Sequence, residues 1–212
     1  MLDNFRSKFT EFSSKKNLQL DLGKVPSTYV ELLLAFGGKS FDRGLYTIHT
    51  FEDSLIWNDI IPKSFTNFDG KVLSFGHDWM GRQFCIPKTE DKCILMFDSS
   101  QQDDFILFES LFEFHDNILG NSKLENLSPD LFEKVMQSLS IQSITYDECL
   151  GHKLPLFLNG NDELSNYEKV DLKFYWTSQR QMYDQVKFLP DGTRVSSAGV
   201  ILDFKPDSRK DN

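Results

Sequence analysis

The chain has 212 residues, and its 23 lysine and arginine residues against 32 aspartate and glutamate residues give a net charge of −9. Hydrophobic residues make up 40% of the chain and charged residues 26%, with 20 phenylalanines, which excludes disorder as the main state. No apolar run is long enough to cross a membrane, so we expect a soluble, cytoplasmic protein with no membrane partner. The negative charge disfavours direct nucleic-acid binding and favours a partner with a basic surface.

Two helical patterns open the chain. Apolar residues at spacings of three and four predict a short helix within residues 1–12, and they are Leu2, Phe5, Phe9 and Phe12. A second helix is predicted to begin at Pro26 and to end at Gly37 and Gly38, because proline suits a first helical turn and glycine a helix end. Its buried face is predicted to carry Tyr29, Leu32, Leu33 and Phe36.

Short strand-like runs follow, and we predict that they form the sheet. They cover residues 45–50, 71–75, 82–86 and 93–97. If the last two form a hairpin that is symmetric about Thr89, Cys85 lies opposite Cys93. The three cysteines have no paired spacing, which argues against a disulfide framework and against a structural zinc site.

The second half of the chain mixes strand and helix signals. A run at 105–108 leads into a helix that ends at Gly120, with one face formed by Phe108, Leu111, Phe112, His115, Ile118 and Leu119. Another helix is predicted to start at Ser128, Pro129 and Asp130, with Ser128 as its cap and with a buried stripe of Leu131, Phe132, Val135 and Leu139. Further predictions are a strand at 154–158, a helix at 171–186, a turn at 190–193 and a strand at 200–204.

Together these elements predict an α+β fold, with a twisted, mostly antiparallel sheet flanked by helices in a single compact unit with a C-terminal extension. We divide the chain into a helical N-terminal segment (1–20), a core (21–120), a C-terminal portion packed on the core (121–204) and a frayed tail (205–212).

Recognisable catalytic and cofactor motifs are absent from the sequence. It contains no GxSxG, GxxxxGK[ST] or GxGxxG, and the spacing of its four histidines favours no metal site. The segment 75–82 places His77 beside Asp78, which could act as a base and its orienting group. Neighbouring side chains on a tight turn point apart, so we favour a structural turn there. We therefore predict no catalytic residue, no metal and no cofactor.

Residues 98–116 carry six acids and no lysine or arginine, interleaved with phenylalanines. A solvated face and an acidic patch for a basic partner both fit this pattern. Our candidates for contact with a partner are Trp57, Asp78, Trp79, Asp103, Asp104 and Glu109. Both tryptophans have burial in the core as their alternative, since large aromatic side chains are highly buried on average.

Five further motifs lie at residues 26–29, 32–38, 44–46, 75–81 and 109–114. In composition and order they resemble the SUKH superfamily (Smi/Knr-like), which joins bacterial immunity proteins to fungal cell-wall-synthesis regulators. A second block resembles the C-terminal part of type VI secretion immunity proteins of the Tdi type, at residues 149–160, 166–176 and 189–193. Asn159 departs from this pattern, since the first of two glycines is expected there.

The resemblance implies a SUKH-like core over residues 21–120 and a Tdi-type portion over residues 121–204. It also implies an immunity protein that binds a cognate bacterial toxin and neutralises it by stoichiometric contact, without catalysis. The toxin expected for the Tdi type is a secreted nuclease with a cationic groove. A non-catalytic cytosolic scaffold or regulatory module of the same fold is the alternative.

Overall fold

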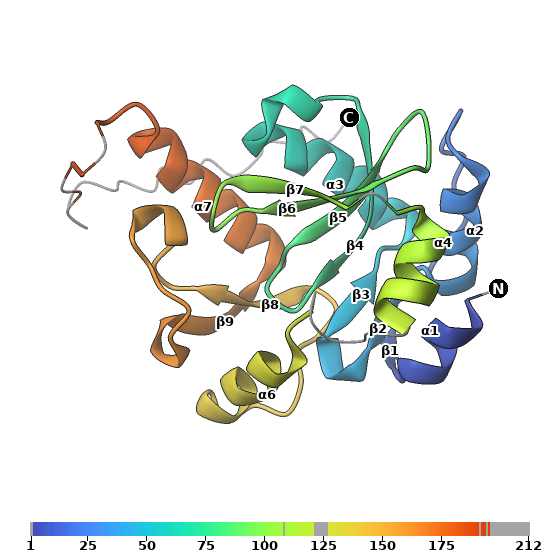
Figure 1. Cartoon of the computed structure of the whole chain (residues 1–212), viewed down its shortest axis with the longest axis horizontal. Coiled ribbons are helices and arrows are strands. Elements are labelled where there is room, and N and C mark those ends of the chain that lie inside the picture. The colour runs from blue at the N-terminus through green and yellow to red at the C-terminus, as the bar shows by residue number, and fades with distance from the viewer. Residues whose placement is uncertain (1, 108, 121–126, 191, 194, 196–212) are drawn as a thin grey trace, which may run out of the picture.

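The computed structural model describes residues 2–107, 109–120, 127–190, 192, 193 and 195. It has an α+β fold, in which a seven-stranded sheet with flanking helices is followed by a small two-stranded sheet and a long helix (Figure 1). The fold class predicted from the sequence is therefore confirmed. No helix in these described ranges combines the length and the apolar character needed to cross a bilayer.

The seven strands lie in the sheet in chain order, and each pairs antiparallel with the next. Their bounds are β1 Glu11–Ser14, β2 Lys39–Phe41, β3 Tyr46–Ile48, β4 Val72–Asp78, β5 Gln83–Pro87, β6 Ile94–Asp98 and β7 Asp103–Leu107. The strand runs predicted at 45–50, 71–75, 82–86 and 93–97 thus correspond to β3, β4, β5 and β6. Central β4 is buried along its whole length, whereas the outer strands β1 and β7 are largely exposed.

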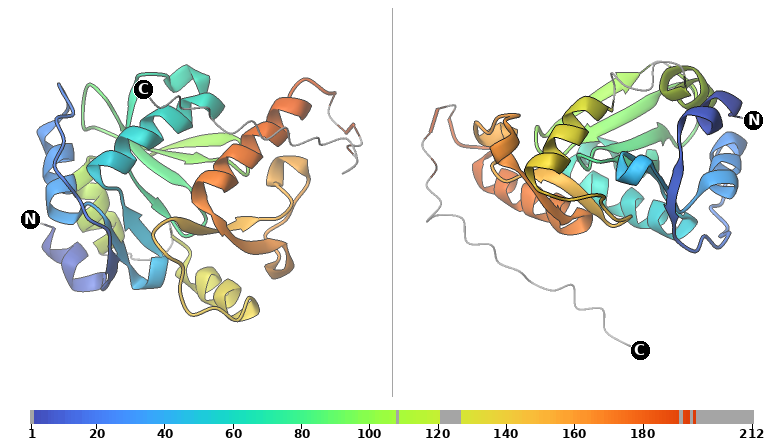
Figure 2. Two further views of the ribbon diagram at one scale, coloured as in Figure 1. Left: turned by 180° about the vertical axis from the view of Figure 1, so that it is seen from behind. Right: turned by 90° about the horizontal axis from the view of Figure 1, so that it is seen from below.

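Alternating side chains of the central strands fill two hydrophobic cores, one on each face of the sheet. Leu73 and Phe84 pack with α1 (Asp3–Lys8) and α4 (Leu111–Glu113) on one face. Their strand neighbours pack on the other face, where helices α3 (Phe51–Ser64) and α7 (Leu172–Val186) cover the sheet. Seen from behind in Figure 2, α3 and α7 cross in front of the strands.

The first predicted helix is shorter than expected. Helix α1 ends at Lys8, and the chain then enters β1, so Phe12 lies on an outer strand with 47% of its surface exposed. The prediction of one helical stripe through Phe12 is wrong, because residues 11–14 form strand β1 and pair with β2. The second helix is confirmed as α2, Ser27–Phe36, with the four predicted residues buried.

Gly38 ends α2 for a steric reason. Its φ is +83°, and a Cβ atom there would lie 2.5 Å from the carbonyl oxygen of Lys15. Only glycine fits this conformation and this close approach, as the helix-end prediction required.

Helix α3 was not predicted from the sequence. Its buried face mixes the polar residues Asp53 and Ser54 with Trp57 and Ile61, so the apolar periodicity is weak.

The hairpin register predicted from Thr89 is wrong. Cys85 lies opposite Leu95, so the pairing centres on Glu90, and Cys93 lies outside the strand. In the loop between β5 and β6, the Glu90 N–H donates a hydrogen bond to the Pro87 carbonyl and forms a turn. All three cysteines are free thiols.

The helix after β7 begins as α4 and continues as a π-helix over Phe114–Leu119. Leu111, Phe114 and His115 form its buried face, while Phe112 is 44% exposed. The prediction that buried Phe112 is therefore wrong, because positions three and four after Leu111 share its face and the next residue does not. Phe108 and the side chain of Ile118 lie outside the described residues.

Helix α6, Pro129–Ser138, confirms the start predicted at Ser128, Pro129 and Asp130. Ser128 makes no side-chain cap, because its backbone is left-handed with a φ of 48°. Met136 is buried in this helix, whereas the predicted Leu131 and Leu139 are only half-buried.

The C-terminal portion contains elements that the sequence did not indicate. Strands β8 (Glu148–His152) and β9 (Tyr167–Asp171) form a separate antiparallel sheet. The strand predicted at 154–158 is instead a 3₁₀ turn at Leu156–Leu158. Helix α7 confirms the prediction for 171–186, whereas the strand predicted at 200–204 and the tail lie outside the described residues.

Candidate functional site

The six residues nominated for partner contact fall into two groups. Trp57, Asp78 and Trp79 are buried, whereas Asp103 is exposed and Asp104 and Glu109 are partly exposed. The structure does not bring the two groups together on one surface.

Trp57 belongs to the core behind the sheet. It is 2% exposed, stacks on the His49 ring at 5.9 Å and meets the Trp176 ring edge-on at 5.6 Å between ring centroids. The alternative of burial therefore holds for Trp57, and its nomination as a surface contact is wrong.

Asp78 shapes the turn between β4 and β5. Its Oδ1 accepts hydrogen bonds from the backbone N–H groups of Met80 and Arg82, and its Oδ2 lies 2.6 Å from Nε of Arg82. Burial raises the pKa of Asp78, and the Arg82 guanidinium opposes that shift. With its carboxylate committed to this turn, Asp78 is not a surface contact residue.

Trp79 also has a structural role in this turn. Its Nε1–H donates to the Leu127 carbonyl at 2.6 Å, and the side chain is fully buried. His77 packs against the rings of His49 and Tyr146, away from the partners of Asp78. The segment 75–82 is therefore the end of β4 followed by a structural turn, and its His77 and Asp78 do not form a pair.

Three of the six acids in residues 98–116 stabilise nearby turns and helix ends by hydrogen bonds. Asp98 accepts hydrogen bonds from the N–H groups of Ser100 and Gln101, and Glu113 forms a capping box with Ser110. Asp116 accepts from the N–H groups of Asn4 and Phe5 at the start of α1. These three carboxylates are engaged inside the molecule.

The other three acids lie on the last strand of the sheet, β7, or just after it, in the same stretch as exposed apolar side chains. Asp103 and Phe105 point to one face of the sheet and Asp104 and Ile106 to the other, because side chains alternate along a strand. Phe105 is 38% exposed, Ile106 50% and Phe112 44%. We call this group the β7 surface, and it consists of Asp103, Asp104, Phe105, Ile106, Glu109 and Phe112. In the part of the chain that the structure describes, β7 pairs with β6 alone, so its outer edge is open.

A polar pocket, which the sequence did not indicate, lies between α3 and α7. It has a volume of about 250 Å³. We call it the α3/α7 pocket, and its lining residues are Lys15, His49, Asp53, Trp57, His77, Tyr146, Asp147, Asp171, Leu172 and Lys173. They come from separate segments of the chain, so no motif spacing could reveal them.

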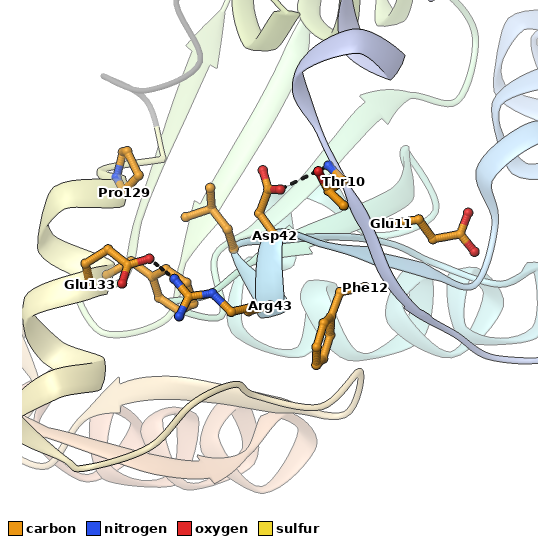
Figure 3. A pocket seen from close by; sticks show the side chains of 9 residues that line it. Thr10, Glu11, Phe12, Asp42, Arg43, Pro129 and Glu133 are labelled. Atoms are coloured by element: carbon orange, nitrogen blue, oxygen red, sulfur yellow. Dashed lines mark hydrogen bonds and ion pairs between the residues drawn. The ribbon is translucent and has the colours of Figure 1, made fainter.

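A second depression, of about 420 Å³, lies between β1 and α6 (Figure 3). Arg43 and Glu133 form an ion pair across it, and the Asp42 carboxylate accepts a hydrogen bond from the Thr10 N–H. Arg43 and Glu133 neutralise each other, and one carboxylate oxygen of Asp42 is buried without a hydrogen-bond partner in the described part of the chain.

Metal-ligand geometry is absent among the described residues, where no three His, Cys, Asp or Glu side chains converge. His115 is fully paired inside the core, with Nδ1 2.8 Å from the Leu111 carbonyl and Nε2 2.9 Å from the Tyr46 hydroxyl. The Nε2 atom of His152 lies 2.9 Å from a carboxylate oxygen of Asp162.

The class that these features define is an α+β protein with an open, acidic and apolar sheet edge and a separate polar pocket. No protein-family model matches the chain, and no curated protein is significantly similar to it in sequence. The crystal structure of Atu4351 from Agrobacterium tumefaciens is similar in fold, with a TM-score of 0.62 at 15% identity. The match covers 85% of this chain and 89% of that chain, and at this identity it shows the fold alone.

Proposed function

We propose that this protein is an immunity protein that binds a cognate bacterial toxin in the cytoplasm and neutralises it by stoichiometric contact. The observation that carries the proposal is the β7 surface, whose strand edge, unpaired among the described residues, carries exposed apolar side chains and acids. An exposed strand edge can pair with a strand of another protein. The resemblance of the sequence motifs to SUKH and Tdi-type immunity proteins supports the same conclusion.

Each part of the β7 surface has a task in such a complex. Phe105, Ile106 and Phe112 supply apolar anchors, which contribute most of the affinity in a typical interface. The open edge of β7 offers backbone N–H and C=O groups to a partner. Asp103 and Asp104 attract a basic toxin surface, such as the substrate groove of a nuclease, and speed the encounter. The protein acts by occupying that surface and transforms no substrate.

The test is co-expression with the toxin encoded beside the gene. The unaltered protein should restore growth, and the double variant Asp103→Lys with Asp104→Lys should bind the toxin at least about tenfold more weakly and lose protection. The matched control is Asp130→Lys with Glu168→Lys, which reverses two exposed acids on α6 and β9. Calorimetry with the purified toxin measures the affinity of each variant.

Two outcomes contradict the proposal. If the unaltered protein neither protects cells nor forms a complex with the neighbouring toxin, it is not an immunity protein, and the scaffold alternative takes its place. If both double variants weaken binding equally, the β7 surface is not the contact site.

A further inference from the structure

Two histidines in the wall of the α3/α7 pocket carry buried polar atoms that lack a hydrogen-bond partner in the described structure. Within the described ranges, His49 and His77 each have a buried Nδ1 atom that makes no hydrogen bond, and both histidines line the pocket. Their side chains belong to residues that are 0% and 2% exposed. Because buried polar groups in native proteins are nearly always paired, unpaired ones at a pocket indicate a ligand that completes them.

The hydrogen bond of His49 to Gln83 determines which of its two ring nitrogens carries the proton. Its Nε2 lies 2.9 Å from Oε1 of Gln83, which is an acceptor, so Nε2 carries the proton. Burial lowers the pKa of His49 to about 4, so the ring is neutral near neutral pH. Nδ1 therefore presents a lone pair that needs a hydrogen-bond donor.

His77 adds a second neutral ring to the same wall. Its centroid lies 5.2 Å from that of His49, and burial lowers the pKa of His77 well below its ordinary value. A neutral imidazole keeps one acceptor nitrogen, so the two rings together offer two acceptors.

The charges that line the pocket favour a cation. Asp53, Asp147 and Asp171 outnumber Lys15 and Lys173 by one. Burial acts to raise the pKa of Asp53, but the hydrogen bond from Thr50 and the neighbouring positive charges hold it below its ordinary value, so the group is ionised.

The carboxylate and an aromatic ring are placed to receive such a cation. Asp53 accepts from Lys15 Nζ at 3.2 Å, while its Oδ1 lies 3.9 Å from Lys173 Nζ, beyond hydrogen-bond distance. The Lys15 ammonium also lies 4.8 Å from the centre of the Tyr146 ring, so this wall already accommodates a positive charge.

We propose that the α3/α7 pocket binds a small molecule that carries a guanidinium or primary ammonium group. Its N–H groups donate to Nδ1 of His49 and to the His77 ring, and Asp53 balances its charge. The volume of about 250 Å³ limits the ligand to a compact molecule. The side chains of Lys15 and Lys173 are 41% and 44% exposed, so their flexible stems can turn outward when the ligand enters.

Titration with methylguanidine, followed by NMR of the histidine ring nitrogens, tests the proposal without any toxin. The signals of His49 and His77 should shift and saturate, and those of His115, whose nitrogens are both paired, should stay in place. Tetramethylammonium has the same charge but no N–H group, so it should bind more weakly and shift the signals of His49 and His77 less than methylguanidine does. The proposal fails if methylguanidine leaves His49 and His77 unchanged or if tetramethylammonium shifts them equally.

A variant and a metal titration complete the test. His77→Phe keeps a ring and removes both nitrogens, so methylguanidine affinity measured by calorimetry should fall about tenfold, with circular dichroism as the check on folding. If this variant does not fold, the titration of the unaltered protein still decides. A saturable shift with zinc ions, together with none from methylguanidine, would replace the proposal with a metal site.

Discussion

The buried histidines make the stability of this fold depend on pH. His115 accepts a hydrogen bond from the Tyr46 hydroxyl through Nε2, which requires the neutral ring. Burial lowers the pKa of His115 to about 4, and it lowers the pKa of His49 equally far. In the unfolded chain a histidine titrates near 6.5, so the unfolded state binds more protons between these two values.

The free energy of unfolding should therefore be highest above about pH 6.5 and should fall as the pH drops toward about 4. Each of these two histidines contributes a loss of about 2 kcal/mol between about pH 7 and about pH 5. His115→Gln cannot titrate but keeps a donor and an acceptor, so its loss over this interval should be smaller by that amount. Urea denaturation at the two pH values measures the difference, and an equal loss in both proteins contradicts the assignment.

Among the secondary-structure elements, two helix starts that look alike in sequence differ in structure. The Thr50 hydroxyl accepts a hydrogen bond from the Asp53 N–H at 2.9 Å, so it caps α3. Ser128 stands in the same position before α6, but its left-handed backbone turns the hydroxyl away from the cap role. Capping by a hydroxyl therefore depends on backbone conformation as well as residue type.

Thr50→Ala should lower the free energy of unfolding by about 1 kcal/mol, because it leaves the first turn of α3 without its cap. Ser128→Ala is the matched control, and its effect should stay within about 0.5 kcal/mol. Denaturant unfolding of both variants checks the contrast. Equal losses would show that the hydroxyl of Thr50 does not stabilise α3.

How far the sequence predicts an element depends on how local its signal is. Strands β4, β5 and β6 are short runs rich in apolar residues and pair with sequence neighbours, so their positions could be predicted. Strands β8 and β9 are joined by a loop with its own 3₁₀ turns, and they carry few apolar residues, so they were missed. Helix α3 was missed because polar groups occupy part of its buried face.

The candidate sites follow the same rule. Asp103 and Asp104 belong to one run of acids, which a sequence shows directly, whereas the exposure of Ile106 depends on the position of β7 in the sheet. The α3/α7 pocket combines His49 and His77 with residues more than 60 positions away, such as Tyr146. Only the folded chain brings these groups together.

At the scale of the whole molecule, the charge of −9 acts on any partner before contact is made. Association with a basic toxin should slow as the ionic strength rises, since salt screens long-range attraction, while dissociation should change less. Stopped-flow measurements of complex formation over a range of salt concentrations test this expectation. An association rate that does not change with salt concentration would show that long-range charge attraction does not contribute to complex formation.

The turn between β4 and β5 is held from outside by the C-terminal portion of the chain. The Leu150 N–H donates to the Trp79 carbonyl at 2.7 Å, and the Trp176 indole donates to the Gly81 carbonyl at 2.7 Å. A shortened protein that stops before β8 would leave both carbonyls without these donors and one hydrophobic core without its cover. Removal of the C-terminal portion should therefore destabilise the turn between β4 and β5 and the core behind it.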